Sequence, residues 1–178
     1  METNARIRVV LLSTESHERS VAHLVRSLLD EGRRVLYVTA NRPYRTLAAA
    51  LRQAGLDPDA LRFVDVVSSL NGSIPAERPE NVRFVRSPTM LEMIAMRAEQ
   101  DVQGPGPCTH VLVDSLNALA IYNGPRPVQE FAHFLVNRMR GRQTGLDLLV
   151  SDSEEGRSLG DLVSGFVDER MHLNGVAP

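Results

Sequence analysis

The sequence predicts a single α/β domain with a mostly parallel central sheet and helices on both of its faces. Short apolar segments rich in β-branched residues alternate with segments whose apolar residues recur at helical spacing. The short segments are nearly continuously apolar, which is typical of parallel strands buried on both faces. The chain of 178 residues is long enough for one domain with a substantial core. We expect the domain to span residues 6–173, between short flexible termini at 1–5 and 174–178.

The first half of the chain contains three predicted strands and two predicted helices. Apolar residues at helical spacing from Val21 to Leu29 predict a helix that ends at Gly32. The same spacing from Leu47 to Ala54 predicts a helix that ends at Gly55. Residues 68–79 are rich in Ser, Gly, Asn and Pro and predict an exposed loop. The predicted strands are 7–12, 35–39 and 63–67.

The second half continues the same alternation. Ser87 and Pro88 predict a helix start, because serine can cap a helix and proline suits its first turn. The apolar spacing from Val128 to Met139 predicts the clearest amphipathic helix of the chain. The other predicted elements are strands at 82–85, 111–113, 146–150 and 166–173, a helical face at 91–98 and a short helix at 159–163.

Composition limits the classes of partner and location. A net charge of -2 and an aromatic content of 4% give neither a global attraction to nucleic acid nor a stacking platform for bases, so we expect no nucleic-acid partner. The first apolar run, 7–12, is too short to enter a membrane, so we expect no membrane association. The single cysteine, Cys108, excludes an internal disulfide and suits a reducing cytoplasm.

Ligands of parallel α/β sheets bind at the carboxyl ends of the strands. The candidate site therefore lies after Leu12, Thr39, Val113 and Val150. The five histidines show no spacing typical of metal ligands, so we expect no metal site. Met90, Met93 and Met96 repeat every three residues, a pattern that indicates either core packing or an adaptable groove for a partner.

The loop after the first strand, residues 13–20, aligns without a gap with the phosphate-binding pattern G-x-x-x-x-G-K-[ST]. Ser13 and Glu18 fall at the two glycines, and Arg19 falls at the lysine, although the chain contains no lysine at all. Glu15 and Glu18 would repel a phosphate by about 4 kcal/mol each at 4 Å and an effective dielectric of 20. The loop is then either a structural strand-to-helix turn or a residual anion site.

The anion-site alternative uses the side chains of Ser16, Arg19 and Ser20. A further candidate is Asp114, which follows an apolar strand and precedes Ser115. In a P-loop ATPase an acid at this place binds magnesium through water. The simpler interpretation is that Asp114 caps the turn at Leu116.

The chain resembles the core of a RecA-type ATPase, nearest to the KaiC and RadA branch. The segments that support this resemblance are 35–39, 47–56, 111–119, 148–152 and 166–173, and the likeness spans roughly residues 6–173. The resemblance implies a RecA-like domain in which the first strand and the strand of Asp114 are neighbours. It also implies subunits that associate side by side.

Departures from that family concern the reactive groups. The family places a catalytic glutamate just after its second strand, where this chain has Ala40, Asn41, Arg42 and Pro43. The lysine, both loop glycines and the catalytic acid are therefore missing, whereas the position of Asp114 is retained. We interpret the chain as a non-catalytic pseudo-ATPase with no catalytic residue, no metal and no cofactor beyond a vestigial ATP and magnesium site.

Such a domain would act as a regulatory or scaffolding module that binds a protein partner, a second copy or an active RecA/KaiC-like relative. Arg42 and Arg45, beside the end of the second strand, could reach an acidic surface of that partner. One alternative is an atypical nucleotide-binding protein or weak ATPase that uses Arg19, Ser20 and Asp114. Another is an unrelated doubly wound domain with a signalling or small-ligand role.

Overall fold

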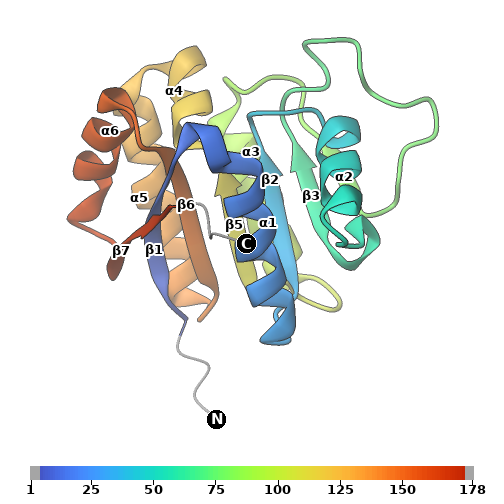
Figure 1. Cartoon of the computed structure of the whole chain (residues 1–178), viewed down its shortest axis with the longest axis horizontal. Helices are drawn as coiled ribbons and strands as arrows, with labels where there is room; N and C mark the ends of the chain where they lie inside the picture. The colour runs from blue at the N-terminus through green and yellow to red at the C-terminus, as the bar shows by residue number, and fades with distance from the viewer. Residues whose placement is uncertain (1–4, 175–178) are drawn as a thin grey trace.

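The computed structural model describes residues 5–174 and confirms the predicted fold class. Its centre is a parallel sheet of seven strands in the order β4-β3-β2-β5-β6-β1-β7 (Figure 1). The strands are β1 Ile7–Leu12, β2 Val35–Thr39, β3 Arg62–Asp65, β4 Val82–Phe84, β5 His110–Asp114, β6 Gly145–Ser151 and β7 Glu169–Leu173. The expected flexible termini fall almost entirely outside the described residues.

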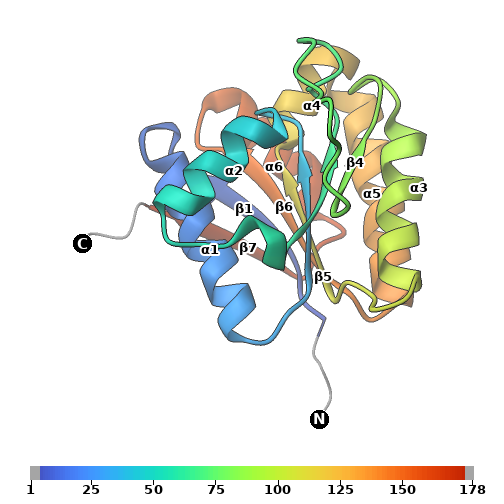
Figure 2. The same ribbon diagram turned by 90° about the vertical axis from the view of Figure 1, so that its right-hand side faces the viewer.

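Helices cover the two faces of the sheet in unequal numbers (Figures 1 and 2). One face packs against α1 and α2, and the other packs against α3 to α6. The helices are α1 His17–Asp30, α2 Tyr44–Gln53, α3 Leu91–Gln103, α4 Leu116–Asn123, α5 Pro125–Gly141 and α6 Glu154–Ser164, with short 3-10 turns at η1 Thr14–Ser16 and η2 Pro58–Ala60. Within residues 5–174, none of these helices is long and apolar enough to cross a membrane.

The central strands β1, β2, β5 and β6 are largely apolar because each one contributes to two cores, whereas the edge strand β7 is largely exposed. In β1, Val9 and Leu11 belong to the core under α3 to α6, whereas Val10 and Leu12 belong to the core under α1 and α2. All four side chains are at most 1% exposed. Burial of each stabilises the fold by about 1.5–3 kcal/mol. Successive residues of a strand point to opposite faces, so a continuous apolar run is what a doubly covered strand requires.

Several predicted boundaries were wrong, and so was one predicted pairing. The first strand and the strand of Asp114 are not neighbours, because β6 pairs with both and lies between them. Helix α3 begins at Leu91 and not at Ser87, because the Ser87 hydroxyl accepts the amide of Thr89 in a separate turn. Strand β7 begins at Glu169, three residues later than expected. Helix α4 was not predicted.

A buried ionic cluster joins the three neighbouring strands β1, β6 and β5. The carboxylate of Asp147 on β6 accepts two hydrogen bonds from Arg8 on β1, at 2.6 and 2.8 Å. It also lies 2.9 Å from Nε2 of His110 on β5. Gly145 leaves room for that histidine, since a Cβ there would lie 2.2 Å from the ring nitrogen Nδ1. Asp147 is fully buried, so these partners compensate a charge that burial alone would strongly disfavour.

The Asp147 cluster predicts acid-sensitive stability. Burial acts to raise the pKa of Asp147, but hydrogen bonds from His110 and Arg8 outweigh it, and the pKa lies below the ordinary 3.8. This carboxylate therefore stabilises the fold at neutral pH, and its contribution is lost as the pH falls from 3.8 towards the lower folded-state pKa. We expect Asp147→Asn to lower the free energy of unfolding by about 3–5 kcal/mol at pH 7, measured in urea.

The loss should shrink as the unfolding is repeated towards pH 3, because the wild type then loses the same contribution. Asp161→Asn is the matched control, because that carboxylate is 68% exposed in its pair with Arg170. Its effect should stay within about 0.5 kcal/mol. A loss for Asp147→Asn that is equal at both pH values would contradict the assigned role of the charge.

Candidate functional site

The candidate site is a polar cluster at the carboxyl edge of the sheet, centred on Asp114. Strand β5 ends at Asp114, beside Thr39 at the end of β2 in the parallel register. Tyr37 comes from β2, Asn41 from the loop that follows it, and His17 from the first turn of α1. The parallel sheet brings these segments to one edge although they are far apart in the sequence.

The Asp114 carboxylate is enclosed by donors of the same chain. The side chain is 1% exposed. One oxygen, Oδ2, accepts the Tyr37 hydroxyl at 2.5 Å, and the other, Oδ1, accepts the Asn41 amide at 2.8 Å. Nε2 of His17 lies 3.0 Å from Oδ1 and 3.2 Å from Oδ2. Three side chains therefore meet the hydrogen-bonding needs of this buried group.

Two further contacts fix the backbone around Asp114. Its carbonyl oxygen accepts the amides of Ala40 at 2.7 Å and Asn41 at 3.2 Å, which holds the end of β2 against the end of β5. The next residue, Ser115, caps α4 by accepting the amide of Ala118 at 3.3 Å. The helix cap that the sequence suggested for Asp114 is thus provided by Ser115.

Tyr37 is the most deeply buried member of the cluster. Burial, followed by the negative charge of Asp114 and the hydrogen bond to it, raises the pKa of Tyr37 well above 10. The phenol therefore remains protonated at neutral pH and acts as a donor to the carboxylate. The centroid of the Tyr37 ring lies 5.9 Å from that of the Phe63 ring, in the core under α1 and α2. Tyr37 therefore links the polar edge of the sheet to its apolar interior.

The loop after β1 is compact. Thr14–Ser16 form the 3-10 turn η1, which runs directly into α1 at His17. Ser16 and Ser20 are buried, and the hydroxyl of Ser20 has no hydrogen-bond partner among the described residues. Arg19 is exposed in the first turn of α1. Between residues 5 and 174, no hydrogen bond or ion pair joins Arg19 or Ser20 to Asp114.

The two predicted partner-binding arginines lie at the same edge but differ in their surroundings. Arg42 forms an ion pair with Glu18, and its side chain is 19% exposed. Its pair therefore connects the loop after β2 to the first turn of α1. Arg45 is exposed in the first turn of α2. Of these two arginines, Arg45 is the one that has no ion pair among the described residues.

Sequence reasoning identified Asp114 but missed the three residues that contact its side chain. His17 was considered only as a metal ligand, and Asn41 only as the place of a missing acid. Tyr37 could have been suspected, because it is a phenol within an otherwise apolar strand and requires a buried partner. Within residues 5–174, no group of three or more His, Cys, Asp or Glu side chains could hold a metal ion.

Comparison with a solved structure shows that the fold is that of a RecA-like α/β domain. The structure aligns with the crystal structure of a KaiC-like protein from the hyperthermophilic archaeon Pyrococcus horikoshii OT3, with a TM-score of 0.67 and 12% identity. The alignment covers 96% of this chain and 73% of the other, and at this identity it shows the fold alone.

The chain belongs to the Family of unknown function (DUF7504), whose model matches residues 8–166. That match spans β1 to the end of α6 and includes every residue of the Asp114 cluster. The sequence matches no curated protein.

The Asp114 cluster predicts that an acid at position 41 destabilises the fold. Asn41→Asp keeps the shape of the side chain but removes the amide donor and places a second carboxylate beside Asp114. We expect the free energy of unfolding in urea at pH 7 to fall by about 1–2 kcal/mol, because a buried acceptor loses its partner. The loss should be smaller in 1 M salt, where exposed charges are screened.

Asn71→Asp is the control, because Asn71 lies exposed in the loop between β3 and β4. It adds the same charge away from the cluster and should change stability by less than about 0.5 kcal/mol. Equal losses in the two variants would show that Asn41 is not a required donor.

Proposed function

We propose that the chain is a pseudo-ATPase, a RecA/KaiC-like domain without catalysis that serves as a regulatory or scaffolding module in the cytoplasm and binds another protein. The observation behind this proposal is the enclosed carboxylate of Asp114. Its oxygens are occupied by Tyr37, Asn41 and His17 at 2.5 to 3.2 Å. A carboxylate with such partners is satisfied without a cation.

Magnesium with ATP does not fit these residues. Magnesium demands near-ideal octahedral geometry, usually keeps several waters, and takes carboxylate oxygens as ligands. A metal ion or its waters at Asp114 would have to displace the Tyr37 hydroxyl or the Asn41 amide. The displaced donor would then lose its hydrogen bond to the carboxylate. Asn41 also stands where the resemblance implies the acid that activates water, and a carboxamide is not a general base. No catalytic step is therefore assigned to this edge.

The phosphate-binding side is also altered. Glu18 occupies a glycine position of the expected loop and is held there by Arg42. The short 3-10 turn of η1 leads straight into α1, where Glu15 and Glu18 add negative charge near the helix start. Arg42 offsets the charge of Glu18, so the repulsion comes mainly from Glu15. A carboxylate 4 Å from an anion repels it by about 4 kcal/mol at an effective dielectric of 20, which weakens binding roughly a thousandfold. Arg19 is the one arginine of the first turn of α1, and its guanidinium is not a compact ammonium.

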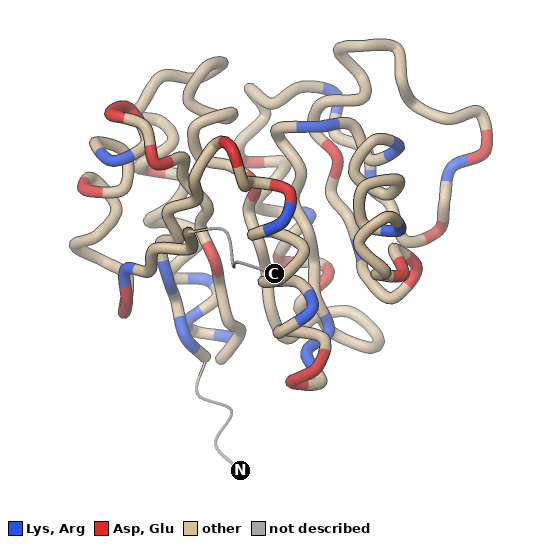
Figure 3. Tube along the Cα trace, in the orientation of Figure 1, with Lys and Arg blue, Asp and Glu red and all other residues tan. Residues whose placement is uncertain are grey.

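A binding role is favoured over other chemistry by the remaining reactive groups. Burial raises the pKa of Cys108 to about 11, so its thiol is protonated at neutral pH and is a poor nucleophile. Acidic and basic positions are interspersed along the chain in the view of Figure 3, a pattern that suits a protein partner better than a polyanion. The partner could be another protein, a second copy or an active relative of the same fold.

The first test is a calorimetric titration with ATP and magnesium. We expect no binding heat at millimolar nucleotide and no thermal shift, because the edge lacks a metal ligand and a phosphate loop. Arg19→Ala and Arg45→Ala form a matched pair of exposed arginines in the first turns of α1 and α2. Micromolar affinity that only Arg19→Ala abolishes would overturn the proposal and support the atypical nucleotide-binding alternative.

The second test is the mass of the protein in solution, measured by light scattering over a hundredfold range of concentration, together with capture of binding proteins. We expect a defined oligomer or a stoichiometric partner complex. A strict monomer that forms no stoichiometric complex would contradict the scaffolding role. Arg45→Glu should weaken the complex if Arg45 contacts an acidic partner surface.

A further inference from the structure

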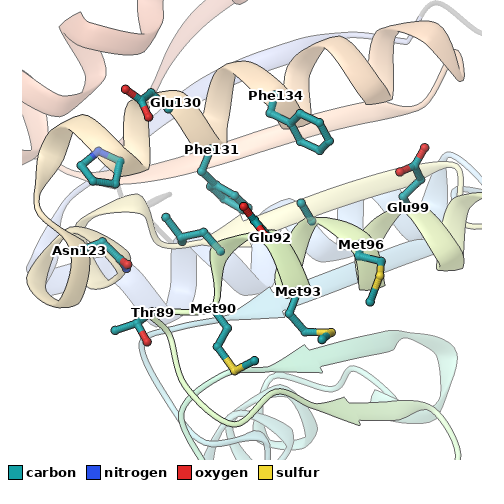
Figure 4. A pocket seen from close by; sticks show the side chains of 13 residues that line it. Thr89, Met90, Glu92, Met93, Met96, Glu99, Asn123, Glu130, Phe131 and Phe134 are labelled. Carbon is teal, nitrogen blue, oxygen red and sulfur yellow. The ribbon is translucent and has the colours of Figure 1, made fainter.

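A groove of about 920 Å³ runs along the outer surface of the molecule between α3 and α5 (Figure 4). We call it the α3–α5 groove and define it by Met90, Met93 and Met96 on the α3 side and Phe131 and Phe134 on α5. In Figure 4 the two phenylalanines extend from α5, and the three methionines follow one side of α3. The groove lies on the opposite face of the sheet from α1 and is separate from the Asp114 cluster.

The apolar side chains of this groove remain accessible. Met90 is 37% exposed, Met96 43% and Phe134 44%. Core packing, one of the two interpretations of the methionine repeat, therefore does not account for Met90 or Met96. Large apolar side chains that share one groove are typical of a binding surface. Methionine is suited to such a surface because its flexible thioether adapts to different partners.

Every charged side chain that lines the groove is acidic: Glu92, Glu99 and Glu130. Glu99 is shared between Arg138 at 3.5 Å and Arg142 at 3.7 Å. Glu130 pairs with Arg126 at 3.4 Å, but both side chains are largely exposed, so the pair is loose. No ion pair within residues 5–174 involves Glu92. Arg138 also lies over the ring of Phe134, 5.0 Å from its centroid, so arginines offset part of the acidic charge at this end of the groove. Glu92 and the loosely paired Glu130 are the lining acids that remain available to a basic side chain of a partner.

We propose that the α3–α5 groove binds an amphipathic helix of a partner protein whose apolar face is flanked by arginine or lysine. This inference rests on the proposed function and specifies the partner. The part of α3 from Leu91 to Glu99 is about 12 Å long, which accommodates two to three turns of a bound helix. Helices bind such grooves through apolar residues at positions i, i+3, i+4 and i+7. Basic flanks supply the complement of the acidic rim.

A helix of a second copy matches the groove less well than a basic amphipathic helix does. The apolar faces of α1, α2, α3, α5 and α6 are all buried in the chain's own cores. Outside the groove, the exposed large apolar side chains on the described helices are Ile121, at 80%, and Tyr122, at 45%, on α4, and the single Leu162, at 42%, on α6. However, α4 has eight residues and no basic side chain, so it does not match the acidic rim.

The test uses a synthetic 14-residue peptide with Leu at i, i+3, i+4 and i+7, Arg at the flanking positions and Gln elsewhere. Binding is followed by fluorescence anisotropy, and the site by NMR of methionine methyl groups labelled with ¹³C. We expect saturable binding that shifts the signals of Met90, Met93 and Met96. The signals of Met139, in the core, and Met171, on β7, should not move.

Phe134→Asp should lower the affinity of the protein for the peptide at least tenfold. Leu162→Asp is its matched control, because Leu162 on α6 is 42% exposed and lies outside the groove. Glu92→Gln combined with Glu130→Gln should weaken binding about tenfold at low salt and less at 0.5 M salt. A peptide with Glu in place of Arg should not bind. Thermal melting of each variant checks that the fold is intact.

Three results would overturn the inference: shifts at Met139 or Met171 only, equal losses for Phe134→Asp and Leu162→Asp, or no saturable binding by the wild type. Self-association that Phe134→Asp abolishes would assign the groove to a second copy instead. These outcomes are separate from the nucleotide titration. Tight ATP binding would refute the pseudo-ATPase function. If neither ATP nor the peptide binds, only the assignment of the groove is refuted.

Discussion

The carboxyl edge of the sheet depends on one physical requirement, the compensation of the buried Asp114 carboxylate. A charge that is 1% exposed is stable only when donors surround it. The donors come from α1, from β2 and from the loop after β2, through His17, Tyr37 and Asn41. This one group on β5 therefore holds α1 and the end of β2 with its following loop in place, although both are distant from Asp114 in the sequence.

The same requirement links the two departures from the RecA-type pattern. An acid in place of Asn41 would set two carboxylates side by side. The residue that donates to Asp114 is therefore the same residue that stands where the resemblance implies a catalytic acid. The ion pair of Arg42 with Glu18 has a similar effect at the adjoining loop, because it offsets the acid that stands where the phosphate-binding pattern expects a glycine. Changes that are separate in the sequence thus form one edge whose polar side chains are satisfied within the chain.

The sequence predicted the strands well because a strand buried on both faces produces an apolar run that is visible locally. Helix α4 was not predicted because its sequence, LNALAIYN, has no polar face and therefore no helical alternation of polar and apolar residues. The position of β6 between β1 and β5 depends on pairing between strands, which no local pattern records. Asp114 was predicted from its strand, but its partners lie 97, 77 and 73 residues away, and only the register of the sheet brings them together.

Helix α4 connects the Asp114 cluster to the α3–α5 groove. Asp114 fixes the end of β5, and Ser115 then caps α4. Asn123, the last residue of α4, donates its amide to the carbonyl of Pro88 at 3.0 Å and lines the groove. The segment that leads into α3 is thereby tied to the end of α4, so the Asp114 cluster helps to determine where one end of the groove lies. The edge around Asp114 therefore has a structural role, because it helps to position the apolar surface on the opposite side of the sheet.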